Sequence, residues 1–252
     1  MTEAEWLTCT DPTPMLEFLR GKASDRKLRL FACACCRRIL HLFTDKNISR
    51  KTIEFAERFA DGEATKNDLH GGAWGKPGQA HPVVQREAWD AAIGCADYGA
   101  DKIANAVLGL DEEKYKAWQS AWDSAWNQWN LAQNRWYYGA EAKEIADASM
   151  PAKWVASGKS ARSEERKCQS FVFRDISGNP FRPISINLAW LTPAVVELDQ
   201  SIYDDRAFDW MPALADALHD AGCDNDEILS HCRGPGPHVR GCWVVDIILG
   251  RA

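Results

Sequence analysis

YKAWQSAWDSAWNQWNLAQNRW, residues 115–136, is the stretch that sets the fold class of this chain. Six aromatic side chains recur in it every three to seven residues: Tyr115, Trp118, Trp122, Trp126, Trp129 and Trp136. At about 100° per residue they fall within a sector of about 80° on a helix, whereas a strand has a period of two residues. Asp and Asn residues take the opposite face. The pattern predicts an amphipathic helix with a wide indole face, here called the Trp stripe.

Three uses of the Trp stripe fit this pattern. The indoles can be buried against the preceding arm of the chain and the N-terminal helices, as part of a core. Alternatively, an exposed stripe can bind a helical or extended peptide, with Trp118, Trp122, Trp126 and Trp129 as the partner-binding side chains. Stacking of a carbohydrate or nucleobase is the third alternative, and it is disfavoured because a helix packs indoles edge-on.

The Trp stripe lies in the second arm of a predicted helical hairpin, residues 83–149. Gly109 favours a left-handed cap at the end of the first arm, and Asp111 can cap the start of the second. At 1.5 Å per residue the second arm would be roughly 55 Å long, longer than a small globular core. We therefore expect the hairpin to protrude, unless the arm breaks near Gly139.

Three further zones surround the hairpin. Residues 1–70 are predicted to form helices, because Thr2 and Glu5 match a capping box and Ser24 precedes an apolar helical face. Residues 151–170 are polar and basic, and are predicted to be an exposed linker or loop, with a phosphate-binding patch as the alternative.

The last zone, residues 171–252, is predicted to contain a β-hairpin followed by helices. Two β-prone runs near 171–186 are separated by the turn residues Ser177-Gly178-Asn179-Pro180. Thr192-Pro193 opens a helix, and the run from 238 to 249 is a further helix with a strand as the alternative. We expect 171–252 to pack with 1–70. The fold class is therefore mainly α: a multi-helix core, a protruding long hairpin and a minor β-hairpin.

Composition excludes several classes of function. The chain has 252 residues, a formal net charge of −6 and a pI near 5.6, which disfavours a non-specific binder of nucleic acid. No apolar run approaches the roughly 18 residues that a membrane span needs. The acidic N-terminus does not resemble a signal peptide, so a cytoplasmic protein is expected. Nine cysteines in that compartment are expected to be reduced thiols.

Candidate metal ligands gather near the C-terminus. Five Cys and His residues lie within twenty positions: Cys223, His231, Cys232, His238 and Cys242. Four of these side chains could supply the nitrogen and sulfur ligands of a tetrahedral zinc ion. The alternative is that the cysteines are small core residues and the histidines form local hydrogen bonds. No cofactor is expected unless this cluster binds zinc.

An enzymatic hypothesis uses the same residues. Cys232 would be a nucleophile with His231 or His238 as its base, in a small-molecule site that also contains Arg240. No known hydrolase, phosphate-loop or metalloprotease motif accompanies them. Asp246 interrupts an apolar run, so it needs a buried partner, and we predict a structural ion pair with Arg240, with Arg174 and Arg233 as alternatives.

Three phrases resemble those of a planctomycete-type protein family: MTEAEWL at 1–7, RDISGNPFRP at 174–183 and HVRGCWVVD at 238–246. The family has no assigned function, so the resemblance implies no activity. From the residues themselves, the leading expectation is a non-catalytic intracellular interaction or regulatory module that binds a protein partner. A zinc-stabilised domain and a small-molecule enzyme are the alternatives.

Overall fold

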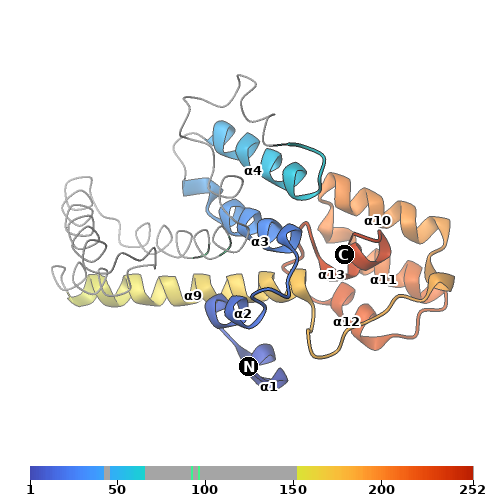
Figure 1. Ribbon diagram of the computed structural model, residues 1–252, viewed down its shortest axis with the longest axis horizontal. Coiled ribbons are helices and arrows are strands. Elements are labelled where there is room, and N and C mark those ends of the chain that lie inside the picture. Colours follow the sequence, from blue (N-terminus) through green and yellow to red (C-terminus); the bar gives the residue numbers. More distant parts are fainter. Residues whose placement is uncertain (43–45, 66–91, 93–95, 97–151, 252) are drawn as a thin grey trace. The chain divides into compact units, whose positions relative to one another are not determined.

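The computed structural model describes residues 1–42, 46–65, 92, 96 and 152–251 (Figure 1). Within these residues the chain is mainly α-helical and contains no strand, which confirms the mainly α class. The elements are α1 Glu3–Thr8, α2 Pro12–Phe18, α3 Asp25–Arg38, η1 Leu40–Leu42, α4 Lys46–Ala60, α9 Ala152–Ser177, η3 Leu188–Trp190, α10 Pro193–Asp205, η4 Phe208–Trp210, α11 Met211–Asp220, α12 Asp226–Arg233 and α13 Trp243–Ile248, where η marks a 3-10 helix.

The predicted hairpin, residues 83–149, lies outside the described residues apart from two isolated positions. Its Trp stripe, including Trp118, Trp122, Trp126 and Trp129, therefore stays a prediction. Residues 1–99 and 166–252 form one compact unit of the chain, and residues 100–165 form another. The candidate sites discussed below belong to the first unit, whereas α9 has residues in both.

Local capping signals start the helices where the sequence predicts. Thr2 and Glu5 form the complete capping box at α1. The Ser24 side chain accepts from the N–H of Lys27 at α3, and Thr192 caps α10 with a proline at its first position. Asn225 caps α12, where its side chain accepts from the N–H of Ile228. Because each signal acts within one turn, sequence alone is enough to place these ends.

Two clusters of apolar side chains make up the core. In the first, α3 packs against α4 and buries nearly every residue from Leu28 to Cys36. The ring of Phe173, from α9, lies between Trp6 and Phe31, with centroid distances of 5.8 and 4.9 Å. The second cluster joins α10, α11, α12 and α13, which gather around the C-terminus (Figure 1).

Two predictions for the middle of the chain are wrong. Residues 152–170 of the predicted 151–170 loop are helical, and residues 171–186 do not contain the predicted β-hairpin, because α9 runs continuously from Ala152 to Ser177. Val172, Phe173 and Ile176 are buried at helical spacing in the first core cluster. Their burial outweighs the β propensity of the local sequence, which depends strongly on context.

The C-terminal run is a helix, as the first of the two alternatives predicts. α13 is shorter than the predicted 238–249 helix and begins only at Trp243. Residues 234–242 before it form a loop without regular structure. In the described parts of the chain, no helix combines the length and the apolar character that crossing a membrane requires.

Candidate metal centre

The candidate site gathers side chains from α9, α12 and the 234–242 loop. Asp175 lies near the end of α9, His231 lies in the last turn of α12, and the loop carries His238 and Cys242. Their ligand atoms are one carboxylate oxygen, two imidazole nitrogens and one thiol sulfur, and all lie within 4.8 Å of one another. We call this group the Asp-His-His-Cys cluster.

Two glycines allow the backbone to bring these elements together. Gly178 ends α9 with a φ of 66°, and a Cβ at this position would lie 3.3 Å from the Trp243 ring. Gly241 has a φ of 95°, and a Cβ there would lie 2.9 Å from Cδ1 of Leu30 in α3. At both positions the backbone has a positive φ and leaves no room for a Cβ. Glycine meets both requirements because it has no side chain.

Short contacts link the members of the cluster. His238 Nδ1 lies 2.8 Å from Oδ1 of Asp175, and His231 Nε2 lies 3.1 Å from the same oxygen. His231 Nε2 also lies 3.2 Å from Sγ of Cys242. The Val239 backbone N–H donates to the other Asp175 oxygen at 2.9 Å. One buried carboxylate therefore ties α9 to both α12 and the loop.

The contacts also assign the ring protons. Trp243 Nε1 can only donate and lies 3.2 Å from Nδ1 of His231, so that Nδ1 accepts and Nε2 carries the ring proton. His238 donates from Nδ1 to the carboxylate of Asp175. In this arrangement the cluster is held together by hydrogen bonds between its own members.

The pKa values of the two acids in the cluster are shifted in opposite directions. Burial raises the pKa of Asp175, but hydrogen bonds from His231 and His238 outweigh it, so the pKa lies below its ordinary value. Burial and the nearby Asp175 charge raise the pKa of the Cys242 thiol well above its ordinary value. The cluster therefore holds one carboxylate and one protonated thiol.

The donor set fits a zinc ion. Carboxylate, imidazole and thiolate are all ordinary zinc ligands, with bonds of about 2.0–2.3 Å. Tetrahedral geometry at those lengths places ligand atoms about 3.3–3.8 Å apart. The three short contacts within the cluster are 2.8, 3.1 and 3.2 Å, so a metal would need these pairs to separate by a few tenths of an ångström. The ligand atoms of the other pairs lie up to 4.8 Å apart, so the most distant would need to approach by about 1 Å.

The structure brings together three of the five predicted ligands. His231, His238 and Cys242 belong to the cluster, whereas Cys223 and Cys232 are buried in the second core cluster. Neighbouring His231 and Cys232 point to different surroundings, as expected of adjacent residues on a helix. Burial, followed by the charge of Asp199, raises the pKa of Cys232 to about 12, which disfavours its use as a nucleophile.

The fourth member, Asp175, is not among the predicted ligands, because the local sequence favours a strand for its segment. A signal was present in the sequence, since Asp175 interrupts the apolar run from Phe171 to Ile176. On a helix this position shares a face with Val172, three residues earlier, which is buried, so its carboxylate must be buried too. The reasoning applied to Asp246 would have singled it out.

Asp246 forms a buried ion pair, but its partner is Arg26 rather than Arg240. Arg26 donates to both Asp246 oxygens, at 2.6 and 2.9 Å, and to Asp61 and the Tyr203 hydroxyl at 2.8 Å. Arg240 instead contacts Asp61 from Nε and Nη2. We call these five residues the arginine network. The partner of Asp246 comes from α3, which no local sequence pattern indicates.

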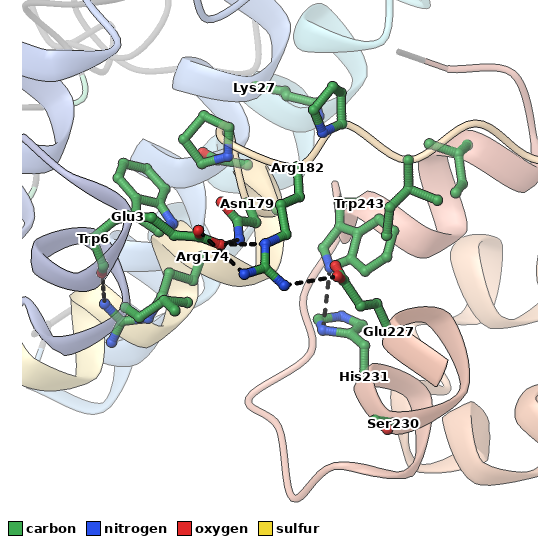
Figure 2. Close-up of a pocket in the computed structure, with 17 residues that line it drawn as sticks. Glu3, Trp6, Lys27, Arg174, Asn179, Arg182, Glu227, Ser230, His231 and Trp243 are labelled. Atoms are coloured by element: carbon green, nitrogen blue, oxygen red, sulfur yellow. Dashed lines mark hydrogen bonds and ion pairs between the residues drawn. The ribbon is translucent and has the colours of Figure 1, made fainter. Parts of the chain in front are cut away.

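A pocket of about 670 Å³ opens beside the cluster (Figure 2). Its labelled polar residues include Arg182, which lies 2.7 Å from Glu3 and 3.8 Å from Glu227. His231 and Trp243 also line this pocket, and the His231 side chain is 20% exposed. The pocket therefore gives an ion a path from solvent to one edge of the cluster.

Comparison of the chain with protein-family models, with curated proteins and with solved structures finds no match. The class of this protein is therefore defined from the geometry of its own structure. It is a mainly α-helical protein with a buried Asp-His-His-Cys cluster that could hold a metal ion.

Proposed function

We propose that this protein is a zinc-stabilised, non-catalytic domain in which the Asp-His-His-Cys cluster binds one zinc ion. The observation that carries the proposal is the convergence of four ligand atoms within 4.8 Å from segments distant in sequence. Zinc would connect the end of α9 to α12 and to the 234–242 loop. The four ligands are brought together only in the folded chain, so the folded state binds zinc far more tightly than the unfolded state, and binding stabilises the fold.

The ligand count supports a structural role for the ion. Catalytic zinc sites usually offer three protein ligands and keep one position for water, whereas structural sites are closed by four. Here four protein ligands are available, and Asp175, His238 and Cys242 are at most 8% exposed. A closed site agrees with the expectation of a non-catalytic module and leaves no position for a substrate on the metal.

Zinc binding would change the hydrogen bonds of the cluster. A metal on Nε2 of His231 displaces its proton, so Nδ1 then carries the hydrogen and no longer accepts from Trp243. The indole N–H must turn away. The Trp243→Phe variant removes this competing donor and keeps the ring, so it should bind zinc at least as tightly as the parent chain. Substantially weaker zinc binding by the variant would contradict this arrangement.

Elemental analysis of protein purified without a His-tag tests the proposal directly. One equivalent of zinc is expected, together with a large fall in melting temperature when a strong chelator is added. Cys242→Ser should lower the zinc content well below one equivalent. The matched control is Cys232→Ala, a buried cysteine from the same region outside the cluster, which should keep the metal.

Absence of zinc, with melting curves that do not respond to a chelator or to added zinc, would overturn the proposal. Equal loss of metal from the Cys242→Ser and Cys232→Ala variants would also contradict it, because only Cys242 belongs to the cluster. In either case the cluster would be a hydrogen-bonded element of the core. The predicted protein-binding role of the Trp stripe is independent of both results.

A further inference from the structure

The pocket of about 670 Å³ in Figure 2 contains polar groups that the zinc proposal does not use. Its volume lies in the usual range for sites that bind small organic molecules. Its walls come from α1, α3, the end of α9, the 179–184 segment, α12 and α13. The polar side chains of these walls divide into a paired set and an unpaired set, and the unpaired set indicates what the pocket can bind.

The acids of the lining belong to the paired set. Figure 2 shows Arg182 between Glu3 and Glu227. Glu3 accepts from Arg182 at 2.7 Å and from the side chain of Asn179 at 2.7 Å, and Glu227 lies 3.8 Å from Arg182. Because both carboxylates already face a donor, the pocket does not require a cation.

Lys27 belongs to the unpaired set. Its ammonium group forms no hydrogen bond or ion pair within the described part of the chain. Burial lowers the pKa of Lys27 and the charge of Asp246 opposes this, but both Asp246 oxygens already accept from Arg26. An ammonium group has three N–H donors and no acceptor, and a partly buried charge without a partner is costly. An anion in the pocket would supply that partner.

Two buried polar atoms of the lining have no hydrogen-bond partner among the described residues either: Nε1 of Trp6 and Oγ of Ser177. The Trp6 side chain is fully buried, and its indole N–H can only donate. Buried polar atoms without a partner are rare in folded proteins and call for a specific explanation. The indole, the hydroxyl and the ammonium group of Lys27 can all donate to the same kind of ligand atom, an acceptor oxygen.

The rest of the lining indicates what carries these oxygens. Arg174 donates to the backbone carbonyls of Trp6 and Cys9 and pairs with no acid among the described residues, so three bases line the pocket against two acids. The apolar part of the lining includes Leu7, Pro180, Pro183, Ile184, Trp243 and Ile247. A bare inorganic ion would leave that surface in contact with water, whereas the apolar body of an organic anion would cover it.

We propose that this pocket binds a small organic acid whose oxygen atoms accept from Lys27, Trp6 and Ser177 and whose apolar body packs against Trp243. The site requires no zinc and uses no cluster member as a ligand for the acid. It also differs from the enzymatic hypothesis made from the sequence, because it assigns binding and no reaction. His231 lines the same pocket, so a bound acid would cover the edge of the Asp-His-His-Cys cluster that faces solvent.

A small side-chain movement gives the acid access to the indole N–H. Glu3 lies one helical turn before Trp6, so the two side chains are neighbours on one face of α1. Arg182, which holds Glu3, is 62% exposed, and exposed ion pairs contribute little free energy. The incoming acid therefore displaces this pair at little cost, and Arg182 remains free to turn toward Glu227.

Isothermal titration of the full chain with phenylacetate and hexanoate tests the proposal, with neutral phenylacetamide and the short acid acetate as comparison probes. At least one of the two apolar acids should bind one to one, and at least about tenfold more tightly than either comparison probe. Lys27→Met removes the ammonium group and keeps an unbranched side chain, so it should weaken binding by at least about tenfold. Ser177→Ala should weaken binding by about two- to tenfold, because a neutral hydrogen bond is lost.

Lys22→Met is the matched control, since Lys22 is an exposed lysine outside the pocket and its replacement should leave binding unchanged. A second measurement does not depend on the stability of a lysine variant. In NMR spectra of the parent chain the indole N–H resonance of Trp6, identified by its absence from Trp6→Phe, should move downfield when the acid binds. This movement is expected because the N–H gains an acceptor.

Three results would overturn the proposal: no binding of either apolar acid, equal binding of phenylacetamide, or unchanged affinity in Lys27→Met. An unmoved Trp6 resonance in the presence of bound acid would also contradict it. If acetate bound as tightly as phenylacetate and hexanoate, the assignment of the apolar walls would be refuted. Titrations with and without a strong chelator keep these results separate from the zinc measurements, because neither Lys27 nor Ser177 is a member of the Asp-His-His-Cys cluster.

Discussion

The Asp-His-His-Cys cluster and the arginine network are both buried, both contain carboxylates and both join α3 or α9 to the C-terminal helices, yet their chemistry differs. In the network, Asp61 and Asp246 have side chains with no exposure and face guanidinium groups. In the cluster, the carboxylate of Asp175 faces imidazoles and a thiol. A guanidinium always carries its proton and has no lone pair for a metal, whereas imidazole and thiolate do.

This difference shows that burial of charged groups does not by itself indicate a metal site. The network balances two arginines against two aspartates with fixed charges. Burial disfavours the charge of Arg26, but the contact of Arg26 with Asp246 outweighs this and raises the pKa of Arg26. Burial and the hydrogen bond to Asp61 together raise the pKa of Tyr203 to about 12. The cluster, by contrast, has protons that a metal can replace. The network is a fixed structural element and the cluster is a candidate ligand site.

The largest effect is expected from breaking the network at its centre. Arg26→Met leaves Asp61 and Asp246 buried with one guanidinium fewer, and removing one partner of a buried pair typically costs about 3–5 kcal/mol. Urea unfolding measures this loss. The zinc content should stay unchanged, because Arg26 contacts no member of the cluster in the described structure. A loss below about 1 kcal/mol would show that the network contributes little.

A smaller effect of opposite sign is expected at Asp199, a buried carboxyl of α10 for which the described residues provide no hydrogen-bond partner. Burial, followed by the charge of Asp246, raises its pKa to about 8. The folded chain therefore binds this proton more tightly than the unfolded chain. The stability from Asp199 is complete below about pH 4 and is lost as the pH rises through about 8.

Asp199→Asn should remove this pH dependence. We expect it to stabilise the fold by about 2–4 kcal/mol more at pH 8 than at pH 5, because each pKa unit corresponds to about 1.4 kcal/mol and the unfolded Asp199 is already ionised at pH 5. Unfolding measured at both pH values checks the prediction. Asp205→Asn, an exposed residue of the same helix, is the control. Identical pH profiles for the parent chain and Asp199→Asn would contradict the shifted pKa.

Gly241 lies between Arg240 of the network and Cys242 of the cluster, so a change there disturbs both. Gly241→Ala places a Cβ 2.9 Å from Leu30 and imposes a φ of 95° on an alanine. We expect a loss of about 1–3 kcal/mol. Gly250→Ala is the matched control, because its φ of 65° is also positive but no atom lies within 4 Å of the added Cβ.

Comparison of the two glycine variants separates backbone strain from crowding. If crowding matters, Gly241→Ala is less stable than Gly250→Ala in thermal unfolding and also retains less zinc, since Cys242 is the next residue. Equal destabilisation by the two substitutions would mean that the close approach to α3 does not position the cluster.

The smallest effect is expected at the exposed ion pairs of Figure 2. Arg182 is 62% exposed and contacts Glu3 and Glu227. Arg182→Gln should cost less than about 1 kcal/mol, because solvent and salt screen such pairs. The difference in unfolding free energy between the parent chain and Arg182→Gln should stay below about 1 kcal/mol at low and at high salt. A loss comparable to that of Arg26→Met would show that exposed and buried pairs contribute alike here.

Parts of the fold could be predicted because their causes are local. Thr2, Ser24 and Thr192 place helix starts within a single turn, and the apolar face of α3 follows from the helical period. The two wrong predictions, a loop at 151–170 and a β-hairpin near 171–186, concern a segment whose local preferences conflict with its burial. The burial of Val172, Phe173 and Ile176 in the first core cluster decides that conflict in favour of a helix at 171–177.

The sequence by itself determined the helical class, the starts of α1, α3 and α10, and three of the four members of the candidate metal site, because residues close in the chain share a period or a spacing. Tertiary structure alone decided that Asp175 completes the cluster, that Asp246 pairs with Arg26, and that arginines of α3 and the end of α10 meet around Glu57. Those contacts join positions far apart in the chain, and no short-range pattern encodes which distant side chain will satisfy a buried charge.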